Sequence, residues 1–114
     1  MEEHLIKNID FATVHKLEEL VTYQEGTVVS RTLAQGKTLS ITLFAFDRGE
    51  EISSHTAPGD ALVVLLDGQA EITIGDEVFQ VNKGETIVMP ALVPHALKAI
   101  ERFKMLLIIV FKLT

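Results

Sequence analysis

From Gly26 onward the chain runs as a series of short segments typical of β-strands, each followed by turn residues. Residues 38–46 (TLSITLFAF) show the pattern most clearly, since alternate side chains of an extended chain lie on opposite faces. Gly75-Asp76 and Asn82-Lys83-Gly84 suit tight turns, because glycine and asparagine tolerate positive φ. About nine such strands at regular spacing predict an all-β fold, an antiparallel sandwich or barrel.

The other segments that we interpret as strands are rich in apolar and β-branched residues. They are 27–34, 61–66, 70–75, 77–81, 85–90, 95–99 and 104–112. The run 61–66 is expected to end in a turn at Asp67-Gly68. Residues 105–110 are apolar on both strand faces, which predicts burial on both sides. In a domain this small the second face is expected to be a subunit interface, so a homodimer is predicted.

The N-terminal part of the chain has a different pattern, which predicts a short helix. Asp10 is suited to cap this helix. The apolar residues that follow at spacings of three and four are Phe11, Val14, Leu17 and Val21. Because so short a helix is marginal alone, it is expected to pack on the barrel. We therefore expect an N-terminal segment with a short helix (1–25) and a β-barrel domain (26–114).

Charge and composition limit the kinds of binding partner and metal ligand that can be expected. The formal net charge is −6 and there is no basic run, which argues against nucleic acid and anionic membranes. The longest apolar run, 105–111, is far shorter than the ~20 residues of a membrane helix. The acidic start is unlike a secretory signal, so a cytoplasmic location is expected. There is no cysteine, so a metal would need histidine and carboxylate ligands.

Two spaced motifs carry a family resemblance. In GEEISSHTAPGDALVVLLDG, five residues separate Gly49 from His55, and the stretch closes on Gly68. In GETIVMPALVPH, five residues follow the first glycine before a proline, and the stretch ends at His95. This pattern resembles the cupin superfamily of small β-barrel or jelly-roll proteins over roughly residues 26–111. Leu92 occupies a position at which the family motif has glycine.

The resemblance implies a metal site at the barrel mouth, where three histidines and one glutamate bind a divalent metal in the family. Only His55 and His95 of those four ligands are present. The second histidine of the first motif is replaced by Ala57, and the glutamate by Ala61. In regular strand, positions 55, 57 and 61 share one face, so the two alanines would add only methyl groups there.

The candidate site residues therefore support two interpretations. In the first, His55, His95 and Asp60 hold iron, manganese, nickel, copper or zinc, with Glu50, Glu51 and Glu85 as other candidates for the third ligand. In the second, the histidines are hydrogen-bonded in a metal-free pocket that Ala57, Ala61 and Met89 help to line. A pocket widened by alanines suits a small, largely apolar or aromatic ligand.

Three classes of function follow from these interpretations. The first is a metal-dependent enzyme, an oxygenase or isomerase as the resemblance implies. The second is a metal-free module that binds a small molecule. The third is a metal-free enzyme that uses His55 or His95 as an acid–base catalyst, because an ordinary imidazole titrates near neutral pH. The two alanines favour the second class over the first. The sequence does not decide whether the protein is an enzyme.

Overall fold

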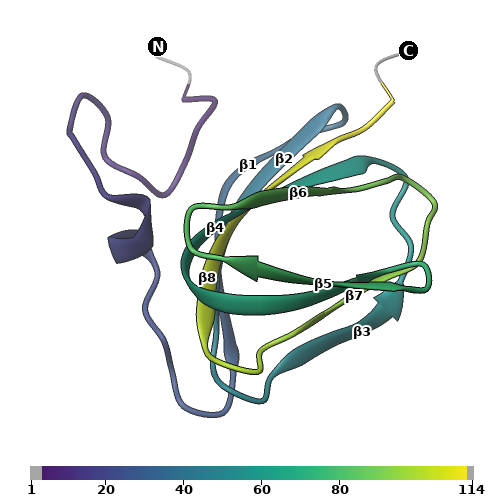
Figure 1. Ribbon diagram of the computed structural model, residues 1–114. Helices are drawn as coiled ribbons and strands as arrows, with labels where there is room; N and C mark the ends of the chain where they lie inside the picture. The colour runs from purple at the N-terminus through teal and green to yellow at the C-terminus, as the bar shows by residue number, and fades with distance from the viewer. Residues whose placement is uncertain (1–3, 113–114) are drawn as a thin grey trace.

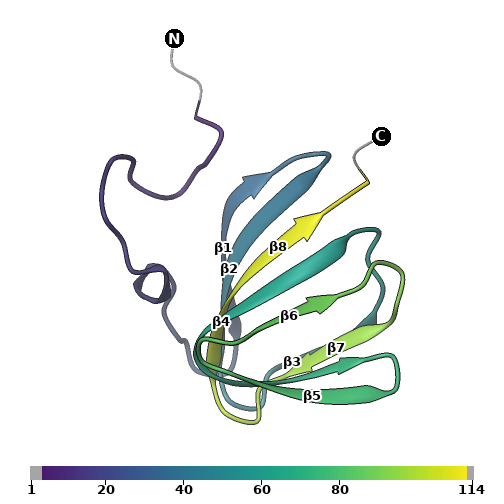
Figure 2. The same cartoon turned by 45° about the horizontal axis from the view of Figure 1, so that its top comes forward.

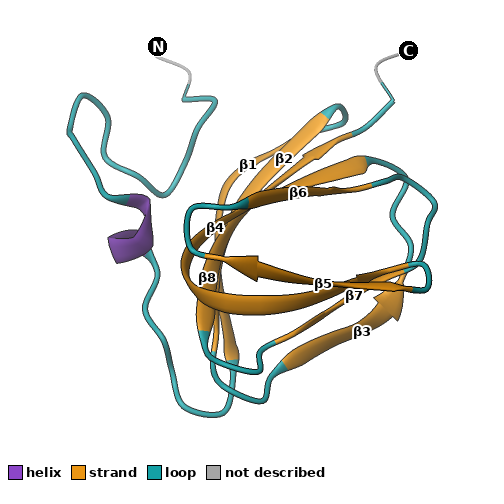
Figure 3. Cartoon of the chain, viewed as in Figure 1, coloured by secondary structure: helices purple, strands orange, loops and turns teal. Residues whose placement is uncertain are grey.

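The computed structural model describes residues 4–112, and the regular secondary structure in this range is almost entirely β-strand (Figure 1, Figure 3). The strands are β1 (Val28–Gln35), β2 (Leu39–Phe46), β3 (Glu51–His55), β4 (Asp60–Ile74), β5 (Glu77–Asn82), β6 (Thr86–Met89), β7 (His95–Lys98) and β8 (Phe103–Val110). All strand pairs are antiparallel, which confirms the predicted all-β fold. Within residues 4–112 no helix is long and apolar enough to cross a membrane.

Strand β4 joins two sheets because it changes partners along its length. Its first part pairs with β8 and β6, and its second part, from Gln69, pairs with β5 and β7. The first sheet thus contains β1, β2, β8 and β6, and the second contains β3, β7 and β5. Figure 1 and Figure 2 show the sheets meeting at the bend of β4, the closed end. At the opposite end, the mouth, residues 56–59 and 90–94 connect the two sheets.

The prediction of a turn at Asp67-Gly68 is wrong, because β4 continues through both residues as one strand. Gly68 has a φ of +74°, which glycine adopts without strain. The register against β8 shifts between Leu65 and Asp67, and Gly68 lies opposite Phe103. A side chain at Gly68 would overlap the carbonyl oxygen of Arg102. This glycine therefore bends a continuous strand, and two predicted strands are one.

Apolar side chains from both sheets fill the barrel interior. The rings of Phe46 and Phe103 stack with their centroids 4.4 Å apart. Burial of each such side chain contributes roughly 1.5–3 kcal/mol to stability. The predicted alternation of residues 38–46 is confirmed, since Phe44 and Phe46 pack in this interior. Leu43 and Ala45 pack instead in a second cluster on the outer face of the first sheet.

The predicted helix after Asp10 is wrong. The only helical element among the described residues is one 3₁₀ turn, η1 (Leu17–Leu20), the purple element of Figure 3. Ala12 has a φ of +52°, a left-handed conformation that interrupts a right-handed helix. Val14 is 98% exposed, so the apolar spacing does not mark one buried face. The apolar residues at spacings of three and four lie instead in an irregular segment, whose conformation depends on its contacts with the barrel.

Residues 4–26, which we call the N-terminal strap, are held by side chains of the first sheet. Lys104 donates a hydrogen bond from Nζ to the carbonyl oxygen of Glu18 over 2.6 Å. Arg31 donates from Nη1 to the carbonyl oxygen of Leu20 over 2.7 Å. These carbonyl groups are bound by the barrel and not by amides of a helix, which explains why the helix prediction fails.

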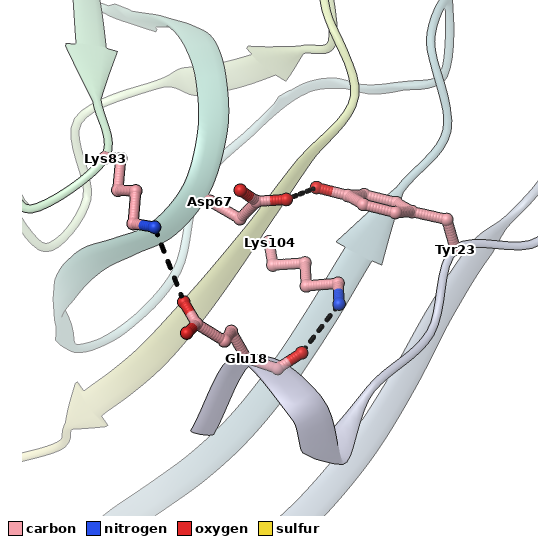
Figure 4. Close-up of polar contacts among 5 residues, drawn as sticks. All are labelled: Glu18, Tyr23, Asp67, Lys83 and Lys104. Carbon is pink, nitrogen blue, oxygen red and sulfur yellow. Dashed lines mark hydrogen bonds and ion pairs between the residues drawn. The ribbon is translucent and has the colours of Figure 1, made fainter. Parts of the chain in front are cut away.

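Tyr23 is the side chain through which the strap contacts the closed end of the barrel (Figure 4). Its hydroxyl donates a hydrogen bond to Oδ2 of Asp67 over 2.6 Å. Cζ of Arg102 and Nζ of Lys104 lie 4.5 Å and 4.9 Å from the centroid of its ring. Burial raises the pKa of Tyr23 well above 10, and the bond to Asp67 raises it further. Figure 4 also shows Lys83 near Glu18.

The outer face of the first sheet is only partly covered. Val21 of the strap packs there with Leu33 and Leu43. Elsewhere Leu39, Val88 and Val110 are exposed apolar residues. The predicted burial of residues 105–110 on both sides therefore holds for part of the segment only, since Val110 is exposed in the chain by itself. The homodimer stays a prediction.

Candidate functional site

Two histidines from distant parts of the sequence lie side by side at the mouth. His55 is the last residue of β3 and His95 the first residue of β7, and the two are partners in the antiparallel register. The centroids of their rings are 4.4 Å apart, and the ring planes meet at 68°, so one ring edge faces the other ring. The register of β3 shifts between Ile52 and His55, which is a β-bulge before the first histidine.

Each ring is oriented by the carbonyl group two residues before it. Nδ1 of His55 lies 3.0 Å from the carbonyl oxygen of Ser53. Nδ1 of His95 lies 3.2 Å from the carbonyl oxygen of Val93. Ser53 and Val93 are not among the residues predicted from the sequence. Any residue type supplies a carbonyl group, so only their position two residues before a histidine could have pointed to them.

The two imidazoles differ in their environment. His55 is exposed, whereas His95 is 4% exposed and is the only buried polar side chain among residues 4–112. Burial lowers the pKa of His95 below its usual 6.5. The hydrogen bond to Val93 opposes this shift, and the neighbouring His55 lowers the pKa of His95 further. His95 is therefore neutral at pH 7.

Asp60 is not brought into a group with the histidines. This exposed residue accepts a hydrogen bond through Oδ1 from the backbone amide of Ala91, over 2.8 Å. A second contact across the mouth joins the same two loops, since the carbonyl oxygen of Ala57 accepts from the amide of Leu92 over 2.9 Å. The regular alternation expected from His55 to residue 61 is absent, because β3 ends at His55 and β4 begins at Asp60.

Leu92 retains the backbone of the residue it replaces. It occupies a glycine position of the resembled motif, and its φ is +66°, in the left-handed region that glycine favours. A non-glycine residue in this conformation costs roughly 1–2 kcal/mol. Its side chain is 74% exposed, so packing of that side chain contributes little against this cost.

Ala61 and Met89 lie near the ends of their strands, beside the loops of the mouth. They are register partners on β4 and β6, and both are buried in the cluster that fills the barrel. The predicted pocket residues are thus of two kinds. The two histidines and Ala57 lie at the ends of strands and in the connecting loop, whereas Ala61 and Met89 belong to the packed interior.

The donor set does not fit a metal held by several protein side chains. Within residues 4–112 no three histidine or carboxylate side chains are grouped closely enough to hold an ion. Asp60 is bonded to Ala91, and Oε1 of Glu85 accepts from the amide of Asn82 over 2.8 Å. The pair of imidazoles would leave most of a coordination sphere to water.

A cavity lies away from the histidines, on β4 and β5. Its volume is about 410 Å³. Its lining residues are Gln69, Ala70, Glu71, Val78, Gln80 and Ile100. None of these residues is predicted from the sequence to line a pocket. It lies nearer the closed end of the barrel than the mouth, because Gln69 directly follows the bend at Gly68.

A family model and several solved structures resemble this chain. Residues 42–111 match the family model described as "Cupin domain". The crystal structure of a conserved protein of unknown function from Streptococcus pyogenes is 47% identical, with a TM-score of 0.96 over 98% of both chains. A cupin superfamily protein from Desulfitobacterium hafniense is 34% identical, with a TM-score of 0.89 over 94% of this chain and 98% of that one.

Two further matches cover only part of the protein compared. A cupin 2 conserved barrel domain protein from Leptotrichia buccalis is 48% identical, with a TM-score of 0.80, over 82% of this chain and 45% of that one. An uncharacterized protein from Streptomyces coelicolor is 34% identical over 59 residues, 52% of this chain. That alignment covers 56% of the relative's length.

Proposed function

The chain belongs to the cupin family, and we propose that it binds a small molecule at the barrel mouth, without a metal held by several protein side chains. The contact between the rings of His55 and His95 is the observation that supports this proposal. Two imidazoles with polar atoms at the mouth, beside an apolar interior, form the kind of site that orients a small ligand.

The replacements in the motif support the same proposal. Ala57 and Ala61 stand where the family resemblance implied a histidine and a glutamate. Each replacement removes a polar side chain that could bind a metal or take part in hydrogen bonds, and leaves a methyl group. The ligand expected at such a mouth has a small, largely apolar or aromatic body with a few polar atoms.

Titration with phenol, followed through backbone amide signals in NMR spectra, tests this proposal. We expect the signals of residues 53–57 and 91–97 to shift together. His55→Ala should weaken phenol binding about tenfold, which corresponds to about 1.4 kcal/mol. His15→Ala is the matched control, because His15 lies on the strap, where Nε2 is bonded to the carbonyl oxygen of Asp10.

Two results would contradict the proposal. The first is a set of shifts confined to the cavity lined by Gln69 and Gln80, with the mouth unaffected. The second is equal phenol affinity in His55→Ala and in the unchanged protein. Either result would mean that the histidine pair is not the binding site.

A metal-dependent oxygenase or isomerase is the second candidate, favoured by the same pair of imidazoles. Elemental analysis of tag-free protein, grown with iron, manganese, nickel, copper and zinc available, separates the two candidates. We expect less than about a tenth of a metal ion per chain. Near-stoichiometric metal that is lost in His55→Ala would overturn the metal-free proposal. The double variant Ala57→His, Ala61→Glu restores both missing ligand types and should raise the metal content.

A further inference from the structure

We propose that the mouth selects ligands that donate hydrogen bonds, because Nε2 is the unprotonated nitrogen in both histidine rings. This inference rests on the proposed function, since it assumes that the mouth binds a small molecule. It goes further by assigning the tautomer of each ring and, from the tautomers, the polar chemistry of the ligand.

The tautomers follow from the two carbonyl contacts. A carbonyl oxygen only accepts hydrogen bonds, so a ring nitrogen bonded to it must carry the hydrogen atom. Nδ1 is the nitrogen near Ser53 in His55 and near Val93 in His95. A neutral imidazole carries one hydrogen atom, so Nε2 holds a lone pair in both rings.

The same geometry occurs on both strands, so the tautomer of each histidine is assigned from its own hydrogen bond. In each case the acceptor is the carbonyl oxygen two residues before the histidine. Because β3 and β7 are antiparallel and His55 faces His95 in the register, the two fixed rings lie against each other. A ligand that contacts one of these rings therefore lies close to the other ring as well.

Nε2 of the buried His95 is accessible at the mouth. In the described part of the chain no buried side-chain nitrogen or oxygen of a residue that is not exposed lacks a hydrogen-bond partner. The hydrogen bond of His95 is made by Nδ1, which leaves Nε2 without a protein partner. Nε2 must therefore reach the surface, although the residue as a whole is only 4% exposed.

The unprotonated Nε2 atoms of the two rings set the class of ligand. A phenol, an alcohol or an amide N–H donates a hydrogen bond to such an atom, whereas a carboxylate meets it with lone pairs of its own. The ligand class is therefore an apolar body that carries O–H or N–H groups. The same Nε2 atoms are those that would act as general bases in an enzyme.

Long-range proton–nitrogen NMR spectra test the tautomers without any ligand. At pH 8 we expect Nδ1 to be the protonated nitrogen in His55 and in His95. His15 is an internal reference with the opposite assignment, because its Nε2 lies 3.0 Å from the carbonyl oxygen of Asp10. Protonated Nε2 in either His55 or His95 would overturn the inference and leave the proposed function standing.

Phenol, anisole and benzoate test the ligand class at the same pH. Anisole has the ring of phenol but no donor, and benzoate carries a carboxylate. We expect phenol to bind about tenfold more tightly than either. His55→Phe keeps a ring but removes a lone pair and should reduce this preference, whereas His15→Phe should leave it unchanged. Equal binding of phenol and anisole at the mouth would overturn this inference alone. No shift at the mouth with any of the three probes would overturn both proposals.

Discussion

The two ends of the barrel are built differently. At the closed end Gly68 is packed against backbone, and Phe103 opposite it stacks on Phe46. Tyr23 of the strap adds a hydrogen bond to Asp67 there. At the mouth the main side-chain contact is the one between the two histidines, and their hydrogen bonds go to backbone carbonyl groups.

This difference suggests that the closed end mainly stabilises the fold and that the mouth mainly binds the ligand. The closed end contributes buried aromatic area and close packing, which are the largest stabilising terms in a small domain. The mouth instead holds Leu92 in a left-handed conformation, which costs stability. Substitutions at the closed end should therefore change folding strongly, and substitutions at the mouth should change mainly ligand binding.

Gly68→Ala should have the largest effect on stability. The new methyl group would overlap the carbonyl oxygen of Arg102, and the φ of +74° adds backbone strain. Because the overlap is with backbone, it cannot be relieved by moving one side chain. We expect the variant to lose more than about 3 kcal/mol of unfolding free energy or to fail to fold. Urea unfolding followed by circular dichroism measures the loss.

Gly84→Ala is the matched control for this prediction. Gly84 has a φ of +86°, but a methyl group there would meet nothing within 4 Å. Its cost should be the backbone strain alone, about 1 kcal/mol. If the two variants lost equal stability, close packing at the closed end would not be the reason for the effect at Gly68.

The fold was largely predictable because alternation is a local property. The two faces of residues 38–46 follow from the spacing alone, and they pack in two different clusters as expected. The bend at Gly68 was not predictable, since Asp67-Gly68 is suited both to a turn and to a kink within a strand. Only the pairing of β4 with β8 decides between them. The strap was mispredicted because Lys104 and Arg31, distant in sequence, bind its carbonyl groups.

The sequence motifs were enough to predict that the two histidines lie close together. They were not enough to predict the geometry around them. The motif spacing placed His55 and His95 in one site, and the structure places their rings in contact. Their role stays a prediction. The direction of the Asp60 carboxylate could not be read from the sequence, because it depends on the amide of Ala91 in a loop far along the chain. The tautomers likewise depend on backbone carbonyl groups. Every residue type has such a group, so the sequence does not show which of them will bind a histidine ring.

Tyr23→Phe should have a smaller effect at the closed end. The variant keeps the ring near Arg102 and Lys104 but loses the hydrogen bond to Asp67. A hydrogen bond to a charged group that is partly exposed contributes about 1.5 kcal/mol. Chemical unfolding at pH 7 measures this loss, and unchanged stability would show that the strap does not reinforce the closed end.

The pH dependence of the same variant gives a second readout. The pKa of Tyr23 is raised in the folded protein, so above pH 10 the unfolded chain loses this proton first. Stability should therefore fall as the pH rises through 10 and beyond. Tyr23→Phe should lack this part of the alkaline loss. An identical alkaline slope in both proteins would mean that the tyrosine is not held protonated by its contacts.

At the mouth the corresponding pH effect has the opposite direction and is expected to be smaller than the effects at the closed end. The pKa of His95 is lowered in the folded protein, so as the pH falls below 6.5 the unfolded chain binds a proton first. Stability contributed by neutral His95 is present above pH 6.5 and is lost as the pH falls toward its folded pKa. Between pH 8 and pH 5.5 the unchanged protein should therefore lose more unfolding free energy than His95→Gln, whereas His15→Gln should follow the unchanged protein. If the difference in unfolding free energy between the unchanged protein and His95→Gln stayed the same from pH 8 to pH 5.5, His95 would lie in a solvated environment. That result would remove the contrast between a mouth that is weakened by acid and a closed end that is weakened by alkali.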